Sequence, residues 1–369
     1  MSVALKGLPE LITEMASAPQ PYRPSPFWEE LAAVGLKQLE NVGFENFKRT
    51  VNMTYFCWDL IGILRQQMPV IGGWLAHPRW RVFRARFPNR TSLKPKKVIY
   101  YSPPNFRVPI PEVTSFNALS GWCYQTYVAM LWDKVAAHDP LKLLSRIAEP
   151  EIGNPFLIEY QGSKTSQDVC NSVHEFYSAG GAAAISKDKW SVAEIGSGYG
   201  RLAYVWLQAL PACQYCLIDI FPALNIAQEY FSRVFPNERI FYFRPFRSYG
   251  EIREEFEASR IRFLAAHQIE LLPPKQFDLF INISSLHEMT YEQIERYLSQ
   301  IDRLCRGRFY MKQWRRSQAP INGLTIGEHE YPIPPGWKQI YGAKHPIQRM
   351  FFHALYDVAP RPLTSAGGS

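Results

Sequence analysis

The sequence predicts an α/β protein with a doubly wound, mostly parallel sheet that follows a mainly helical N-terminal region. After Trp190, short apolar runs alternate with helical patterns at the spacing of β-α units. The stretch VAEIGSGYGRL (192–202) is an apolar run that breaks into a glycine-rich turn and then becomes helical. The last two apolar runs, KQIYGAK (338–344) and RMFFHALYDV (349–358), are close enough to pair as antiparallel strands.

The first 150 residues contain helical patterns on either side of a proline-rich connection. Apolar residues recur at three-to-four spacing in residues 25–67 and again in residues 120–147, which predicts helices. Between them, residues 87–113 are rich in proline and basic side chains, so we expect an extended loop. We therefore predict a helical N-terminal cap or substrate domain over 1–150 and a catalytic domain over 151–369.

The sequence after Trp190 predicts a regular order of strands and helices. Strands are expected at SVAEIG (191–196), CQYCLIDI (213–220), ERIFYF (238–243), RIRFLAAHQI (260–269), FDLFINIS (277–284) and GRFYMKQW (307–314). Helices are expected at RLAYVWLQAL (201–210), ALNIAQEYFSRVF (223–235) and YEQIERYLSQIDRLC (291–305). Sheets of this kind bind ligands at the carboxyl ends of their strands, near the point where the strand order reverses.

Composition and charge indicate an ordinary soluble protein with ample core material. Of the 369 residues, 47% are hydrophobic and 20% charged, and the net charge of +8 gives only a mild preference for anionic partners. No long apolar window or secretory leader pattern is found, so we expect a cytoplasmic protein without membrane insertion. The basic stretches KPKK (94–97) and KQWRR (312–316) are interpreted as solvated surface, and no nucleic-acid partner is expected.

Six cysteines occur without a regular framework. Cys213 and Cys216 form a C-x-x-C pair, which is typical of redox motifs or of half a zinc site. No second pair and no histidine cluster accompanies them in the sequence. We interpret them as ordinary buried thiols and expect no metal ligands in this chain.

The glycine-rich turn points to a nucleoside ligand without phosphate. Its spacing is G-x-G-x-G, not the G-x-G-x-x-G of dinucleotide-binding enzymes. Glu194 precedes the first glycine, and Asp219 ends the next strand, where a carboxylate accepts both ribose hydroxyls. Two carboxylates disfavour a pyrophosphate but suit the cationic S-adenosylmethionine. The alternatives are an NAD site, or glycines that only allow close strand–helix packing.

The stretch FDLFINISSLHEMTYEQ (277–293) places two candidate catalytic residues, His287 and Glu288, just after the end of a strand. Thr290 and Gln293 form a capping-box pattern, so His287 and Glu288 are expected on a short loop before the helix. An imidazole within hydrogen-bond reach removes the proton of a hydroxyl nucleophile near neutral pH. We predict His287 as the general base, with Glu288 orienting it or binding substrate. The alternative is a histidine that only braces the loop.

The chain resembles the bacterial sugar O-methyltransferase family, a branch of the class I S-adenosylmethionine-dependent enzymes. The resemblance covers residues 150–355 well and FENFKRTVNMTYF (44–56) more loosely. It depends on the ordered blocks GNPFLIEYQGSKTSQDVCNSVHEFYS, VAEIGSGYGRLAYVW, CLIDIFPALNIAQEYF, FDLFINISSLHEM and FYMKQW. The resemblance implies a seven-stranded Rossmann-like sheet whose last strand pair is antiparallel, and S-adenosyl-L-methionine as the cofactor.

The resemblance and the strand ends together define two sets of candidate residues. The methionine part of the cofactor would contact the glycines and Glu194, the ribose would contact Asp219, and two residues that close another strand could touch adenine. The cofactor set is Glu194, Gly196, Ser197, Gly198, Gly200, Asp219, Ile220, His267, Gln268, Asn282 and Ser284. The set lining the substrate or cofactor cleft is Gln167, Asp168, Asn171, Ser172, His174, Glu175 and Tyr199.

These observations predict an O-methyltransferase that acts on a hydroxyl of a sugar or of a glycosylated or secondary metabolite. The chemistry itself needs neither a metal nor a covalent intermediate. Alternative acceptors are a carboxylate or an amine of a peptide or other natural product, and a non-catalytic binding scaffold is a further alternative. The partner is expected to be a small-molecule or glycan acceptor, and a homo-oligomer is left open.

Overall fold

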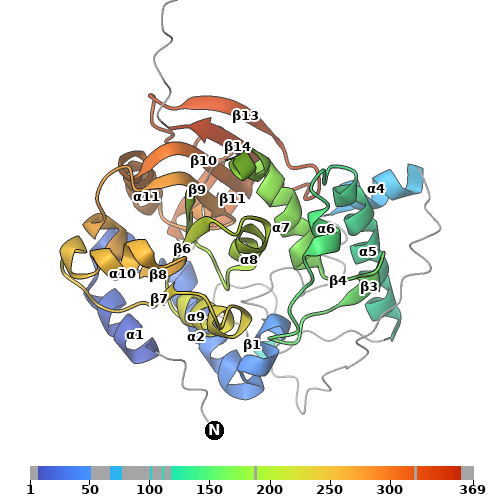
Figure 1. Cartoon of the computed structure of the whole chain (residues 1–369), viewed down its shortest axis with the longest axis horizontal. Helices are drawn as coiled ribbons and strands as arrows, with labels where there is room; N and C mark the ends of the chain where they lie inside the picture. Colours follow the sequence, from blue (N-terminus) through green and yellow to red (C-terminus); the bar gives the residue numbers. More distant parts are fainter. Residues whose placement is uncertain are drawn as a thin grey trace, which may run out of the picture.

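A central eight-stranded sheet organises the molecule (Figure 1). The computed structural model describes residues 7–50, 67–76, 100–101, 110–111, 118–186, 189–319 and 322–358. The sheet has the order β13-β14-β10-β9-β5-β6-β8-β7. Its strands are β5 (Trp190–Ile195), β6 (Cys213–Asp219), β7 (Ile240–Phe241), β8 (Ile261–Ala265), β9 (Phe277–Ile283), β10 (Cys305–Trp314), β13 (Lys338–Lys344) and β14 (Phe351–Asp357).

The sheet is parallel except at one end. β5 pairs in parallel with β6 on one side and with β9 on the other, so the strand order reverses there. β14 runs antiparallel to both β10 and β13. The doubly wound fold and the antiparallel last pair are therefore confirmed. The family resemblance implied seven strands, whereas the apolar runs predicted eight. The sheet has eight, because the two-residue β7 extends the edge beside β8.

The predicted helices lie between the strands. They are α8 (Arg201–Ala209), α9 (Ala223–Val234) and α11 (Tyr291–Leu304). Another helix, α7 (Gln167–Ser178), precedes the sheet and packs against α8. Every residue of β5 and of β8 is buried, as is typical of parallel strands whose two faces are both covered.

Two predicted strands are shorter than the sequence pattern. Within ERIFYF only Ile240–Phe241 is a strand. The run RIRFLAAHQI leaves the sheet after Ala265 and continues as the 3₁₀ turn η6 (Ala266–Leu271). The side-chain Oε1 of Gln268 accepts the N–H of Ala265 at 2.9 Å. This local hydrogen bond caps the turn, and apolar periodicity alone does not reveal it.

The N-terminal region is mainly helical in its described part. Its elements are α1 (Leu8–Ser17), η1 (Gln20–Tyr22), α2 (Pro26–Val42), η2 (Phe44–Arg49), α4 (Met68–Ala76), α5 (Ala118–Ala136) and α6 (Leu143–Arg146). Most of the predicted proline-rich loop (87–113) lies outside the described residues. Its described part is a short antiparallel pair, Tyr100–Tyr101 with Ile110–Pro111. Among the described helices, none is both long and apolar enough to cross a bilayer.

The first helices contact the sheet domain directly. Figure 1 shows α1 and α2 on the same side of the molecule as α9 and α10 (Arg253–Ala258). The Tyr22 hydroxyl donates to Glu270 at 2.7 Å, and Arg233 on α9 pairs with Glu45 at 2.6 Å. Buried residues of both halves belong to one continuous hydrophobic core. The domain boundary at residue 150 stays a prediction.

The remaining elements are short. They are β3 (Ile158–Tyr160), β4 (Ser163–Thr165), η4 (Gly181–Ser186), η5 (Tyr249–Glu251), η7 (Leu286–Glu288), β11 (Arg316–Ala319) and β12 (Leu324–Gly327). Of these, η7 matters for the site, because it directly follows the central strand β9.

Candidate functional site

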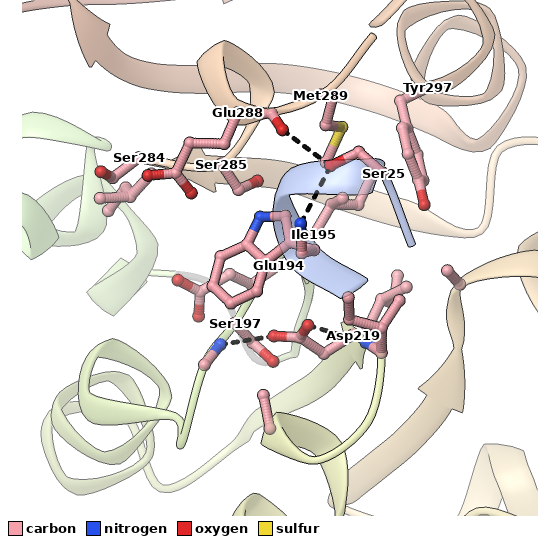
Figure 2. Close-up of a pocket in the computed structure, with 18 of the residues that line it drawn as sticks. Ser25, Glu194, Ile195, Ser197, Asp219, Ser284, Ser285, Glu288, Met289 and Tyr297 are labelled. Atoms are coloured by element: carbon pink, nitrogen blue, oxygen red, sulfur yellow. Dashed lines mark hydrogen bonds between the residues drawn. The ribbon is translucent and has the colours of Figure 1, made fainter. Parts of the chain in front are cut away.

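A cavity of about 490 Å³ lies at the carboxyl ends of β5, β6 and β9 (Figure 2). This is the edge of the sheet at which its strand order reverses. The turn after β5, the end of β6 and the loop after β9 form three of its sides. The segment from Arg23 to Trp28, at the start of α2, forms a further wall.

At the glycine-rich turn, backbone atoms that no side chain covers line the cavity. Gly196 has φ +71°, and a Cβ there would lie 2.3 Å from Ser285 Oγ, so only glycine fits against the loop after β9. Gly198 has φ +57°, and a Cβ there would meet no atom within 4 Å. Gly198 also lines the cavity. The turn therefore packs on one side and leaves its backbone open to a ligand on the other.

Asp219 is fixed at the end of β6 by two backbone groups. Its Oδ2 accepts the N–H of Gly198 at 2.6 Å, and its Oδ1 accepts the N–H of Ile220 at 2.7 Å. Burial raises the pKa of the Asp219 carboxyl to about 7, although both N–H groups oppose the shift. The carboxylate thus spans the glycine turn and the next strand, and it faces the cavity (Figure 2).

Glu194 is the second carboxyl group at this edge. It is 3% exposed, lines the cavity and accepts a hydrogen bond from the Tyr215 hydroxyl at 2.8 Å. Burial raises the pKa of Glu194 to about 8, although the Tyr215 hydrogen bond opposes the shift. A cationic group in the cavity would favour the ionised form of both carboxyl groups.

His287 and Glu288 lie side by side in η7, but they face different surroundings. Glu288 lines the cavity, whereas His287 is 2% exposed and does not. His287 stacks on Trp314 with ring centroids 5.0 Å apart, and its Nδ1 lies 2.9 Å from Oε1 of Gln313. Its Nε2 lies 3.5 Å from Oε1 of Glu288. The imidazole is therefore held behind the carboxylate.

The loop that carries this pair is fixed at its far end by the predicted cap of α11. The Thr290 hydroxyl accepts the Gln293 N–H at 3.3 Å, and Gln293 Oε1 accepts the Thr290 N–H at 2.9 Å. The capping box is confirmed, and the helix begins at Tyr291. The Gln293 side chain also donates to the carbonyl of Arg23 at 2.7 Å, which joins this loop to the N-terminal wall.

The structure brings together ten of the candidate residues on the cavity wall. They are Asp168, Glu194, Gly196, Ser197, Gly198, Tyr199, Asp219, Ile220, Ser284 and Glu288. The other candidates do not line it. They are Gln167, Asn171, Ser172, His174, Glu175, Gly200, His267, Gln268, Asn282 and His287.

Several of these other candidates have structural partners. Asn282 donates to the carbonyl of Ile195 at 2.9 Å and so joins β9 to the end of β5. Gln268 donates to the carbonyl of Arg244 at 2.8 Å, so its amide is used within η6 and not at the cavity. The predicted adenine contact is therefore not placed at Gln268.

Two more candidates, His267 and Gly200, pack against other residues of the protein and not against the cavity. His267 lies 3.5 Å from Glu14 on α1. At Gly200 a Cβ would meet Phe231 at 2.4 Å, so that glycine serves close strand–helix packing. This is the packing role that the sequence left open for the glycines, and it applies at Gly200.

Sequence reasoning missed three parts of the wall. Arg201 directly follows the glycine turn, so its position in the pattern could have indicated it. Lys312 was interpreted as solvated surface within KQWRR, which is wrong: its side chain is 1% exposed and lines the cavity near the end of β10. The Arg23–Trp28 segment carries no local signal of a binding role. Its place is set by long-range contacts, such as the Ser25 hydroxyl that donates to the carbonyl of Glu288 at 3.0 Å.

The fold also brings together a histidine cluster that the sequence analysis did not predict. Among the described residues, His174, His345 and His353 offer ring nitrogens within 4.8 Å of one another. Nδ1 of His345 accepts the N–H of Gln348 at 3.0 Å and that of Ile347 at 3.4 Å. The His345 proton is therefore on Nε2, and the ring has no spare lone pair for a metal ion. Cys213 and Cys216 are buried thiols.

No family model and no curated protein matches this chain. Solved structures share about half of it. The PH0226 protein of Pyrococcus horikoshii OT3 is 13% identical over 52% of this chain and 92% of its own, with a TM-score of 0.37. A SAM dependent methyltransferase from Aquifex aeolicus is 14% identical over 61% and 97%, with a TM-score of 0.34.

A third similar structure is magnesium protoporphyrin IX methyltransferase (ChlM) from Synechocystis PCC 6803 with bound SAM. It is 12% identical over 52% of this chain and 85% of its own, with a TM-score of 0.33.

Proposed function

We propose that this chain is an S-adenosylmethionine-dependent O-methyltransferase. The observation that carries the proposal is the arrangement of Asp219, Glu194 and the open backbone of Gly198 around one cavity at the reversal point of the sheet. The glycine turn has G-x-G-x-G spacing, and two carboxyl groups, Glu194 and Asp219, lie beside it. This arrangement fits a nucleoside that has two ribose hydroxyls and a positive charge.

The residues present fit the cofactor in separate parts. Asp219 would accept the ribose hydroxyls, and the backbone at Gly198 would lie along the amino-acid end. Ile220 and Ala266 supply apolar surface beyond Asp219, suited to adenine. When bound, the cofactor supplies an electrophilic methyl group for an in-line displacement. The protein then has to position the acceptor and remove its proton.

Glu288 and His287 would handle the acceptor proton together. Glu288 reaches the cavity, so its carboxylate would accept a hydrogen bond from the acceptor hydroxyl. His287 Nε2, 3.5 Å behind it, would take the proton as general base through that carboxylate. Gln313, which lies against Nδ1 of His287, fixes the ring orientation. The proposal thus keeps His287 as the base and gives contact with the acceptor to Glu288.

The acceptor proposed is a hydroxyl of a sugar or of a glycosylated or secondary metabolite. The acceptor side of the cavity combines flat apolar side chains with hydrogen-bonding groups. The flat and apolar members are Phe27, Trp28, Met289, Trp314 and Phe351. Sugar rings and aromatic rings both pack on such faces, while their hydroxyls bind carboxylates and hydroxyl groups.

A carboxylate acceptor is the second candidate, and Lys312 favours it. Lys312 places a cation on the cavity wall, and a carboxylate needs no general base because it arrives ionised. Substitution of His287 therefore separates the two acceptor classes. A hydroxyl acceptor needs this residue and a carboxylate does not.

Calorimetry tests the proposed function directly. S-adenosylhomocysteine and NAD are titrated separately into the wild-type chain and into Asp219→Ala. The proposal expects S-adenosylhomocysteine to bind the wild type, with at least tenfold weaker binding to the variant. NAD binding without S-adenosylhomocysteine binding would overturn it. Acceptors are then screened by the mass of one added methyl group.

A further inference from the structure

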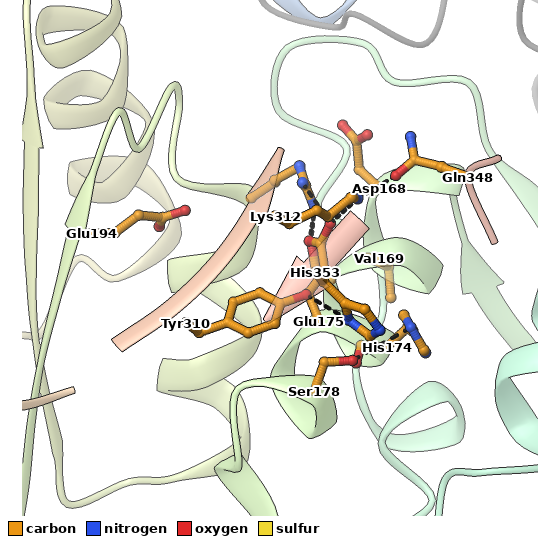
Figure 3. Close-up of polar contacts among 12 residues, drawn as sticks. Asp168, Val169, His174, Glu175, Ser178, Glu194, Tyr310, Lys312, Gln348 and His353 are labelled. Carbon is orange, nitrogen blue, oxygen red and sulfur yellow. Dashed lines mark hydrogen bonds and ion pairs between the residues drawn. The ribbon is translucent and has the colours of Figure 1, made fainter. Parts of the chain in front are cut away.

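Two buried side-chain amides, Asn282 on β9 and Gln313 on β10, lie beside the loop that carries His287. Both are fully buried. Met311 is the register partner of Asn282, so Gln313, two residues further along, lies on the same face of the sheet. Lys312 faces the other side, where it pairs with Glu175 on α7 (Figure 3). The two amides are therefore diagonal neighbours on adjacent strands, within reach of each other.

Two backbone groups decide which way the Asn282 amide points. Its nitrogen lies 2.9 Å from the carbonyl oxygen of Ile195, which only accepts hydrogen bonds. Its oxygen lies 3.3 Å from the N–H of Leu286, which only donates. The reversed amide would set oxygen against oxygen and donor against donor, which is costly for buried groups. Oδ1 of Asn282 is therefore an acceptor.

The Gln313 amide takes its direction from Asn282. Nε2 of Gln313 donates to Oδ1 of Asn282 at 2.5 Å and lies 3.3 Å from the backbone carbonyl of the same residue. Oε1 of Gln313 then faces the other way, where it accepts the backbone N–H of His287 at 3.3 Å. The same oxygen lies 2.9 Å from Nδ1 of His287. Gln313 thus presents an oxygen, not an amide hydrogen, to the imidazole ring.

An oxygen at this distance determines which ring nitrogen carries a hydrogen. A bare Nδ1 would set two lone pairs against each other at 2.9 Å, so Nδ1 of His287 keeps its hydrogen. The N–H of Trp314 also approaches Nδ1, but at 3.5 Å, which is the weaker contact by distance. Nε2 is then the nitrogen that gains or loses a proton. It makes no hydrogen bond within the described chain and lies 3.5 Å from Oε1 of Glu288.

The opposite tautomer would turn the lone pair of the ring away from Glu288. With its hydrogen on Nε2, the ring would donate to the Glu288 carboxylate and could not take a proton from it. Without Gln313, the surroundings would favour this form, because Trp314 N–H would donate to a bare Nδ1. The Gln313 oxygen is the group that excludes it.

We propose that Asn282 and Gln313 are positioning residues that keep the hydrogen on Nδ1 of His287, so that Nε2 receives the proton of the acceptor hydroxyl. This inference rests on the proposed function. In the proton step, the O–H bond of the acceptor breaks, Glu288 takes up that proton and a proton passes from Glu288 to Nε2, which converts the neutral ring to imidazolium. Nδ1–H stays bonded to Gln313 throughout.

Nitrogen NMR of the ligand-free protein with isotope-labelled histidine tests the tautomer. A ring nitrogen that carries a hydrogen resonates far from a bare one, and the His287 signals are identified by their absence in His287→Ala. In the wild type, Nδ1 should keep the signal of a protonated nitrogen at every pH, and only Nε2 should shift as the ring titrates. A bare Nδ1 at any pH would overturn the inference. This measurement depends on no variant of the two amides.

Substitutions of Gln313 separate positioning from packing. Gln313→Met fills a similar space without an oxygen, so Nδ1 should lose its hydrogen in the neutral ring and kcat should fall by about tenfold or more, with KM nearly unchanged. Gln313→Glu returns an oxygen to Nδ1 and should restore the protonated signal and most of kcat. Gln228→Met is the matched control, because Gln228 is also buried and accepts the N–H of Phe243 at 2.7 Å, away from the cavity. It should keep the wild-type His287 signals and kcat.

Asn282 is tested by the same signals. Asn282→Leu removes the acceptor of Gln313 Nε2 and frees that amide to turn, whereas Asn282→Asp keeps an acceptor oxygen. The first variant should resemble Gln313→Met, and the second should keep the protonated Nδ1. A wild-type tautomer and a wild-type kcat in Gln313→Met or in Asn282→Leu would overturn the role of that residue.

The outcomes separate this inference from the proposed function, because the tautomer is read without cofactor or acceptor. If the expected signals are found but S-adenosylhomocysteine does not bind, the proposed function fails and the tautomer assignment stands. If S-adenosylhomocysteine binds and Nδ1 of His287 is bare, the positioning inference fails and the proposed function stands.

Discussion

Nε2 of His287 lies 3.5 Å from Oε1 of Glu288, and of these two neighbours only Glu288 borders the cavity. The loop after β9 thus presents a carboxylate to the cavity and keeps an imidazole behind it, stacked on Trp314. The proposed base would therefore act through its neighbour. This relationship makes the two residues separable by experiment.

His287→Ala and Glu288→Gln should each lower kcat by on the order of 10²-fold to 10⁴-fold, the usual contribution of general base catalysis. Because His287 does not line the cavity, its loss should leave S-adenosylhomocysteine binding unchanged. The double variant should be little worse than either single variant, because the two residues handle one proton. His329→Ala, whose side chain is 91% exposed, is the control.

Methyl transfer that survives His287→Ala at near wild-type rate would contradict a hydroxyl acceptor. It would favour the carboxylate acceptor, which arrives already deprotonated.

Asp219→Asn should weaken S-adenosylhomocysteine binding less than Asp219→Ala. The asparagine oxygen can still accept the N–H of Gly198 or of Ile220, whereas alanine leaves both without their acceptor. We expect losses of several-fold and of at least tenfold, respectively, measured by calorimetry. Equal binding by all three proteins would remove Asp219 from the ligand site.

Gly196→Ala and Gly198→Ala should fail in different ways. Both positions have positive φ, which costs a non-glycine residue about 1–2 kcal/mol. Only at Gly196 would the new Cβ also collide with Ser285, so this variant should lose more stability in urea unfolding. Gly198→Ala should remain folded but bind S-adenosylhomocysteine poorly, because its methyl group enters the cavity.

Gly162→Ala is the control for this pair. Its φ is +81°, no atom lies within 4 Å of its added Cβ, and it is remote from the cavity. It should show the backbone cost alone, with normal ligand binding. Normal ligand binding by Gly198→Ala would exclude that residue from the site.

The ligand-free protein should lose stability between pH 6.5 and pH 8. Burial raises the pKa of Glu194 to about 8 and that of Asp219 to about 7, so the folded state keeps protons that the unfolded state has released. Their stabilisation is present at low pH and is lost as the pH rises through these values. For Glu194 the loss over this pH range is about 2 kcal/mol.

Groups whose titration would raise the stability with pH titrate mainly outside the range from pH 6.5 to pH 8. Buried histidines with lowered pKa, such as His353, change the folding stability below about pH 6.5. Lys312 changes it above its pKa of about 8. Glu194→Gln should flatten the decline in melting temperature over the range. An unchanged slope in that variant would show that Glu194 does not titrate there.

With this protein at neutral pH, Co²⁺ should produce no intense visible band of the kind that a tetrahedral site gives. The reason is that Nδ1 of His345 is already used by the N–H groups of Gln348 and Ile347, so the histidine cluster lacks its third lone pair. His345→Ala should give the same spectrum as the wild type. A visible band that disappears in this variant would show a metal site.

Local patterns in the sequence were sufficient to predict the sheet and part of the cavity wall. Apolar runs and glycine spacing placed β5, the turn and Asp219, because a buried strand and a tight turn constrain residues close in the chain. The Thr290–Gln293 pattern located the start of α11 for the same reason. The early end of β8 depended on the hydrogen bond between Ala265 and Gln268, which periodicity does not encode.

What the sequence by itself determined is the order of elements and which loops reach the active edge of the sheet. Only the tertiary structure decided which side chains face the cavity. It turned His287 inward behind Glu288, brought Arg23–Trp28 over the strand ends and joined Lys312 on β10 to Glu175 on α7, 137 residues away. Such pairings depend on how helices pack on the sheet, and that packing is a long-range property which no local spacing contains.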